Sequence, residues 1–137
     1  MDKVSEITNL VIEINKMKMA AASMNIANSD ATSGSFDSIY KEISVDVQGI
    51  DSLSSYLSGD RPLGDSIKTK YIENENIKQR YEPNNPVAGS SGFVYSANID
   101  HTEQMLDVQS SKRIYEAGLK IYQMNIDMNS SVLRLGK

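Results

Sequence analysis

The sequence contains no cysteine, no tryptophan and a single histidine, His101. The absence of cysteine excludes disulfide bonds, zinc sites with cysteine ligands and thiol nucleophiles, although it does not fix the compartment. His101 lies at the expected start of a helix, where a solvated histidine is far more common than a catalytic or metal-binding one. We therefore expect a protein that is not an enzyme and that has no cofactor and no metal site.

Clusters of basic residues and long hydrophobic runs are also missing. The formal net charge is −4, so the sequence lacks the electrostatic footprint of a nucleic-acid-binding protein. No segment approaches the ~18 uninterrupted apolar residues that a membrane span requires. Asp2 and Glu6 stand where a cleavable signal peptide would carry basic residues. We expect a chain that is soluble when made, with no nucleic-acid partner, no direct membrane insertion and no cleaved signal peptide.

Apolar residues at helical spacing mark the first segment of the chain, residues 3–28. The polar residues Glu6, Glu13 and Lys16 lie on the opposite face from these apolar residues, as a period of 3.6 residues requires. Short polar residues and Gly34 follow the segment and are typical of a helix end. The pattern predicts one amphipathic helix.

The last segment, residues 101–135, predicts a second and longer helix. Asp100 can cap its start, and Glu103 can reach back to complete a capping box. At ~1.5 Å per residue this helix is ~50 Å long, which exceeds what a compact domain of this size needs. Two apolar rows run along it, about a third of a turn apart: Ile114, Ile121, Met128 and Leu135, and Tyr115, Leu119, Tyr122 and Ile126. Because one partner helix can cover only one row, the second row requires further neighbours.

The residues between these helices predict a small β region. Residues 38–48 alternate between apolar and polar side chains, which indicates a strand with one buried face. Residues 49–66 are rich in Gly, Ser and Asp and predict a loop. Residues 67–71 and 93–95 predict a second and a third strand. A sheet of two or three short strands is marginal alone.

The predicted fold is therefore mainly α with a small β region. The N- and C-terminal helices pair as an antiparallel coiled coil, and a short β-strand domain is inserted between them. Residues 1–30 form the N-terminal helix of the helical core, residues 31–97 the polar loop and small β region, and residues 98–137 the C-terminal helix of the core.

A rough energy comparison predicts that this helical pair needs partners. Burying the apolar side chains of the first helix would stabilise it by ~15 kcal/mol. Ordering its backbone costs ~1–2 kcal/mol per residue. A lone pair is therefore close to balance, and we expect the ends of the isolated subunit to be disordered until neighbours cover them. The residues alone thus favour assembly over chemistry.

Three motifs resemble those of flagellar axial proteins. Residues 24–34, MNIANSDATSG, resemble the N-I-A-N-x-x-T-x-G signature of flagellar rod and hook proteins. Residues 111–117, SKRIYEA, resemble their C-terminal S-x-R-x-Y-E/Q-A-N pattern, with Gly118 where the pattern has its final Asn. Residues 81–100 are similar to the Y-x-P-x-x-P-x-A…G-Y-V…P-N-V-D block of flagellar basal-body rod proteins of the FlgC (proximal rod) family, with Ala97 replacing the usual Pro.

This resemblance implies a structural subunit of the bacterial flagellar basal-body rod. Such subunits are exported unfolded and uncleaved by the flagellar type III export apparatus. They polymerise with other flagellar rod proteins and copies of themselves into the periplasm-spanning rod, which transmits torque. The residues expected at subunit interfaces are the apolar residues of both helices and two asparagines of the first motif: Val4, Ile7, Val11, Ile14, Met17, Met24, Asn25, Asn28, Ile114, Tyr115, Leu119, Ile121, Tyr122, Ile126, Met128 and Leu133.

One alternative remains open on the sequence alone. A soluble helical adaptor or export chaperone, acting as a discrete dimer, would also explain two amphipathic helices. It would leave the length of the last helix and the Asn-Ile-Ala-Asn segment without a purpose.

Overall fold

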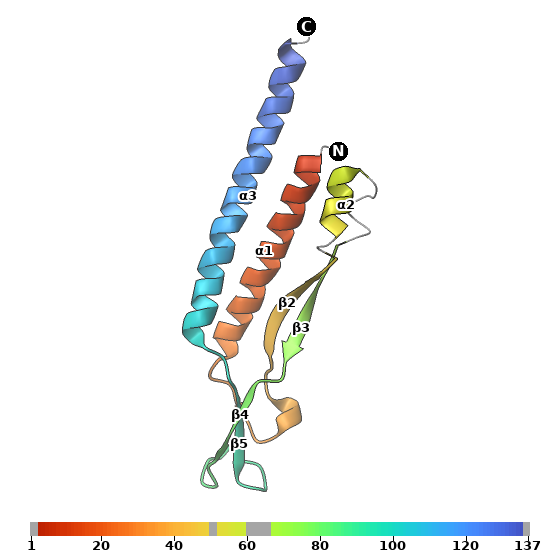
Figure 1. Ribbon diagram of the computed structural model, residues 1–137. Coiled ribbons are helices and arrows are strands. Elements are labelled where there is room, and N and C mark those ends of the chain that lie inside the picture. The colour runs from red at the N-terminus through yellow and green to blue at the C-terminus, as the bar shows by residue number, and fades with distance from the viewer. Residues whose placement is uncertain (1–2, 50–51, 60–66, 136–137) are drawn as a thin grey trace.

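The structure is a computed structural model that describes residues 3–49, 52–59 and 67–135 (Figure 1). Two helices lie side by side along most of the molecule, and the strands lie beside them and at one end (Figure 1). The elements in chain order are α1 (Lys3–Asn28), β1 (Thr32–Ser33), the short 3-10 helix η1 (Phe36–Ser38), β2 (Glu42–Gln48), α2 (Ser52–Ser58), β3 (Lys68–Asn74), β4 (Ile77–Tyr81), β5 (Phe93–Ala97) and α3 (His101–Leu135).

Both predicted terminal helices are present. Asp100 caps α3, because its Oδ1 accepts hydrogen bonds from the backbone N–H groups of Thr102 at 2.8 Å and Glu103 at 3.2 Å. At the end of α1, the Asn28 side chain donates to the Met24 carbonyl at 2.8 Å. Hydrogen bonds from polar side chains thus occur at the start of α3 and at the end of α1, where the polar residues of the sequence predicted helix ends.

The two long helices make the most extensive contact between elements of the described chain. Asn125 in the second half of α3 donates to Ser5 Oγ at 2.7 Å, and Asn25 near the end of α1 donates to Gln104 near the start of α3 at 2.9 Å. The end of α1 therefore lies beside the start of α3 (Figure 1). The close packing of the terminal helices is confirmed, and their supercoiling stays a prediction.

The β region consists of two small antiparallel sheets. β2 pairs with β3 from Glu42↔Asn74 to Gln48↔Lys68, and this hairpin lies along α1 (Figure 1). The other sheet has the order β1-β5-β4, with β5 in the middle. The first predicted strand is shorter than expected: Ser38 ends a 3-10 helix, and residues 39–41 lie outside any helix or strand. The sequence does not predict β4, since this edge strand is mostly exposed and shows no apolar alternation.

The predicted loop over residues 49–66 is wrong in its middle, where α2 forms. Tyr56 of α2 is buried and donates its hydroxyl to Glu6 Oε2 at 2.7 Å. Lys3 lies 5.6 Å from the centre of the Tyr56 ring and donates to the Leu57 carbonyl at 3.1 Å. Contacts with α1 thus stabilise a helix that its Ser-rich sequence disfavours. Residues 50–51 and 60–66 of the predicted loop lie outside the described residues.

The apolar core is small for a chain of this length. Its buried members in the described chain are Ala21, Ala22, Ile39, Tyr56, Val94 and Ala97. The accessible surface is 9289 Å², whereas a compact monomer of this mass exposes about 7,100 Å². The elongated shape therefore leaves much apolar surface uncovered, and most of it lies on α3.

Candidate subunit interface

The buried positions of the two long helices are mainly polar or small, and all but Ala21 and Asn25 recur every seven residues. We call them the polar seam: Thr8, Asn15 and Ala22 on α1, and Gln104, Ser111, Gly118 and Asn125 on α3. A seven-residue repeat returns to nearly the same face of a helix. A Cβ atom on Gly118 would lie 2.8 Å from Ile12 Cγ1, so the helices approach closely there. The subunit therefore joins its own helices through residues of low hydrophobicity.

The apolar rows of α3 flank the polar seam and remain exposed. One row follows seam positions by three residues and the other by one, which places them on opposite sides of the seam at 100° per residue. The exposed fractions range from 43% at Leu119 to 74% at Leu133. The rows consist of Ile114, Ile121 and Met128 on one side, and Leu119, Ile126 and Leu133 on the other. Tyr122 is also exposed, and Tyr115 is half-buried.

The predicted interface residues of α1 are less free than those of α3. Only Val4 and Met24 are exposed. Within the same subunit, α1 packs against both α3 and β2. Five further predicted residues of α1 are half-buried: Ile7, Val11, Ile14, Met17 and Asn28. The free apolar surface of the helical pair thus belongs mainly to α3.

The expectation that Asn25 lies at a subunit interface is corrected, because Asn25 lies inside the subunit and not on an exposed surface. Its side chain is 1% exposed. Its Nδ2 donates to the Ile43 carbonyl at 2.8 Å and to Gln104 Oε1 at 2.9 Å. Its Oδ1 accepts from the Ile43 N–H and from the Tyr40 hydroxyl, both at 2.9 Å. A buried carboxamide is tolerated because its donors and acceptor are satisfied.

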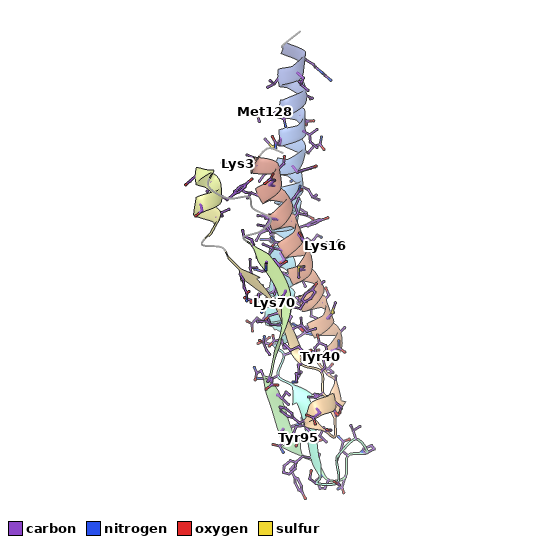
Figure 2. The ribbon with its side chains drawn as sticks, turned by 90° about the vertical axis from the view of Figure 1, so that its right-hand side faces the viewer. Lys3, Lys16, Tyr40, Lys70, Tyr95 and Met128 are labelled. Atoms are coloured by element: carbon purple, nitrogen blue, oxygen red, sulfur yellow. The ribbon has the colours of Figure 1, made fainter. Side chains whose placement is uncertain are left out.

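Gln104 extends this network to β2. Its Nε2 donates to Glu42 Oε1 at 2.9 Å. The pKa of the nearby Tyr40 is raised, chiefly by burial and further by the negative charges of Glu42 and Glu73. We call Asn25, Tyr40, Glu42 and Gln104 the junction, because they connect the end of α1, the start of β2 and the start of α3. Tyr40 lies where the helices meet the strands (Figure 2).

No family model matches the chain, but full-length relatives are present among curated proteins. The flagellar basal-body rod protein FlgC of Salmonella typhimurium is 26% identical over 132 residues, covering 96% of this chain and 95% of that protein. FlgC of Bacillus subtilis is 28% identical over 134 residues, covering 89% of each chain. FlgC of Agrobacterium fabrum is 25% identical over 134 residues, covering 97% of this chain and 93% of that protein.

The resemblance to the flagellar rod protein FlgC is confirmed. The similarity spans both helices and the β region, whereas the three motifs cover separate stretches. The relatives do not support the adaptor or export chaperone. The name that these FlgC proteins carry describes a rod component and not an enzyme.

Two loops that contain residues of the FlgC-like motifs meet closely below the helices. A Cβ on Gly34 would lie 2.4 Å from the Val87 carbonyl oxygen, and one on Gly89 would lie 2.5 Å from the Gly34 carbonyl oxygen. Backbone atoms cannot give way as a flexible side chain can. Glycine is therefore required at both positions for the loop after α1 to contact the loop between β4 and β5.

The described part of the chain offers little else that could serve as a chemical site. It contains no group of three or more His, Asp or Glu residues able to hold a metal ion. None of its helices combines the length and apolar character needed to cross a membrane. An exposed ion pair joins Lys41 to Glu75 at 2.7 Å, and this hydrogen bond raises the pKa of Lys41 and lowers that of Glu75.

Sequence reasoning missed the polar seam, although a signal for it was present. It followed only the apolar residues of α3, and so did not identify which face of that helix packs against α1. The polar and small residues at positions 104, 111, 118 and 125 recur every seven residues between the apolar rows. Searching for a repeat of any residue class would have identified this face.

Proposed function

We propose that this chain is a structural subunit of the bacterial flagellar basal-body rod, which polymerises through its terminal helices and transmits torque. One observation supports the proposal above the others. The helical pair is closed internally by a polar seam, and two apolar rows remain exposed in a chain similar to FlgC over 96% of its length. A protein that acted alone would bury those rows and expose the polar positions.

In this proposal α1 and α3 form an antiparallel coiled coil, and the rows of α3 contact two different neighbouring subunits. Each apolar side chain that becomes buried contributes about 1.5–3 kcal/mol. Contacts between unlike surfaces repeat from subunit to subunit without closing, which produces a helical filament. Interlocked helices in such a filament resist twisting, so torque passes along it.

The partners in this proposal are other flagellar rod proteins, copies of the chain itself and the flagellar type III export apparatus. The location is the periplasm-spanning rod of the basal body. Residues 1–30 and 98–137 form the helical core of the rod, and residues 31–97 lie outside it. The small apolar core supports export in an unfolded state, because little burial must be undone to unfold the subunit.

Replacing a residue of an exposed row tests this function. We predict that Leu119→Asp or Ile126→Asp prevents incorporation into the rod but not export, because either change buries a charge in the contact with a neighbour. The matched control is Gln123→Asp, which introduces the same charge at an exposed polar position of α3. Cells producing each variant in place of the native subunit are scored for motility and for the secreted subunit.

The result depends on the variants keeping their fold. Leu119 is 43% exposed and Ile126 is 45% exposed in the subunit, so their helix content should match that of the control by circular dichroism. Normal motility with Leu119→Asp and Ile126→Asp would contradict the proposed function.

A further inference from the structure

The end of α3 extends past the start of α1. Asn125 bonds to Ser5, so the residues of α3 beyond 128 lie past the described start of α1 (Figure 1). Met128 accordingly lies well beyond Lys3 along the molecule (Figure 2). We call residues 128–135 the α3 tip; at ~1.5 Å per residue it is about 12 Å long.

The α3 tip exposes three large apolar side chains and carries a single, positive charge. Met128, Val132 and Leu133 are 58%, 63% and 74% exposed. Arg134 is the only charged residue of the tip. Exposed apolar side chains beside a lone cation suit a recessed, partly apolar surface with negative charge at its edge.

Such a surface lies beside the start of α3, at the opposite end of the helix. A hollow of about 450 Å³ between α1, β2 and α3 is lined by three carboxylates, Glu42, Glu103 and Asp107, against one ammonium, Lys18. A second hollow of about 380 Å³ is lined by Leu106, Gln109 and the cationic Arg113, so carboxylates outnumber cations three to two over both hollows. Both hollows include Ser110 and Ile114, so they adjoin. We call the two hollows together the α3-base groove.

We propose that the α3 tip of one copy docks in the α3-base groove of a second copy. Leu133 contacts the apolar part of the groove at Leu106 and Ile114, and Arg134 approaches Glu103 and Asp107. This inference rests on the proposed function, since it names the surfaces through which copies associate end to end. A tip cannot occupy its own groove, because residues 114 and 133 of one continuous helix are about 28 Å apart.

The docking fixes how two copies are arranged. Tip and groove are different surfaces, so each copy offers one of each and the contact repeats head to tail. The second copy is displaced along the helix axis by about the distance from the groove to the tip, on the order of 30 Å. The other residues of the apolar rows, Leu119, Ile121, Ile126 and Met128, stay available for lateral neighbours.

Cysteine cross-linking of the whole chain tests the docking, since the sequence has no cysteine of its own. A Leu133→Cys variant is mixed with an Ile114→Cys variant under oxidising conditions. We expect a disulfide-linked heterodimer, because the docked Cα atoms would come within the ~7 Å that a disulfide requires. The matched control pairs Leu133→Cys with Glu116→Cys, which lies at nearly the same height on α3 but 200° around the helix. This control should give a several-fold lower yield.

A charge reversal tests the polar part of the contact. Arg134→Glu in the Leu133→Cys variant should lower the cross-linking yield about two- to fivefold, as expected for an exposed ion pair. Asp107→Arg in the Ile114→Cys variant should restore the yield. Lys120→Glu, on the polar face of α3, should leave it unchanged.

The outcomes separate the docking from the proposed function. If the Glu116→Cys control cross-links as well as Ile114→Cys, or if Arg134→Glu has no effect, the tip does not dock in the groove. If copies associate but this cross-link does not form, the docking is wrong and the proposed rod function is unaffected. A mixture in which no copies associate would overturn the docking, and the motility of the Leu119→Asp variant would then decide the function separately.

Discussion

At the scale of single residues, the joint between helices and strands depends on the carboxamide of Asn25. This side chain bonds to both the N–H and the carbonyl of Ile43, as a neighbouring strand would. It also binds Gln104 of α3 and Tyr40. One residue at the end of α1 thereby fixes where β2 starts and where α3 starts. The strength of the joint comes from satisfied polar groups and not from apolar burial.

Replacing Asn25 should destabilise the subunit strongly. Asn25→Ala removes four hydrogen bonds and leaves buried groups of Ile43 and Gln104 unsatisfied, which costs about 1–3 kcal/mol for each group. We expect the free energy of unfolding to fall by about 3 kcal/mol in denaturant titrations. The control Asn28→Ala, in the same motif, removes only an exposed bond to Met24 and should change it by about 0.5 kcal/mol or less. Similar losses in both variants would contradict this role of Asn25.

At the scale of an element, α3 has two functions on different faces. Its polar seam closes against α1, and its apolar rows stay free on either side. The seam tolerates small side chains because the helices approach closely, as at Gly118 and Ile12. The low hydrophobicity of the seam also disfavours the alternative in which the seam contacts a neighbouring subunit and the apolar rows pack against α1. Burying the seam against a neighbour would contribute little free energy of association.

A larger side chain at position 118 tests the close approach of the two helices at Gly118. Gly118→Leu would force a long side chain against Ile12, and such overpacking costs about 1–3 kcal/mol of the free energy of unfolding. The next residue, Ala117, is exposed, so Ala117→Leu should change stability by about 0.5 kcal/mol or less. Thermal unfolding of both variants gives the comparison. Equal stability of the two would show that the helices do not meet at Gly118.

At the scale of the whole molecule, the elongated shape leaves part of the helical surface without any covering element from the same subunit. The most enclosed large side chains are Val94 in the end sheet and Asn25 in the junction. From there toward the α3 tip, the helices lose cover until α3 stands alone (Figure 1). Backbone hydrogen bonds without packed neighbours open easily, so local stability should fall along the same direction.

Hydrogen exchange on the dilute chain measures this gradient. We expect the amides of the α3 tip to exchange fastest and those near Val94 and the junction slowest. Assembly should then slow exchange along the apolar rows and the tip, because neighbours cover them. Terminal helices that are already protected at micromolar concentration, in a compact dimer, would instead favour an adaptor.

Much of the helical architecture was predictable from local chemistry. The bounds of α1 and α3 follow from apolar periodicity, from Asp100 as a cap and from the polar residues after Asn28, because each of these acts within a few residues of the chain. β2, β3 and β5 were recognisable by alternation or by their apolar residues. The edge strand β4 and the helix α2 were not, since long-range contacts stabilise them: β4 pairs with β5, and Tyr56 of α2 donates to Glu6.

The sequence by itself determined that this chain carries two amphipathic helices at its ends and more apolar surface than one helical pair can bury. Only the tertiary structure decided which face of each helix turns inward. It selected the polar seam over the apolar rows and placed Asn25 inside the subunit. The physical reason is that periodicity defines the faces of a helix, whereas close packing between particular residues decides which face is buried.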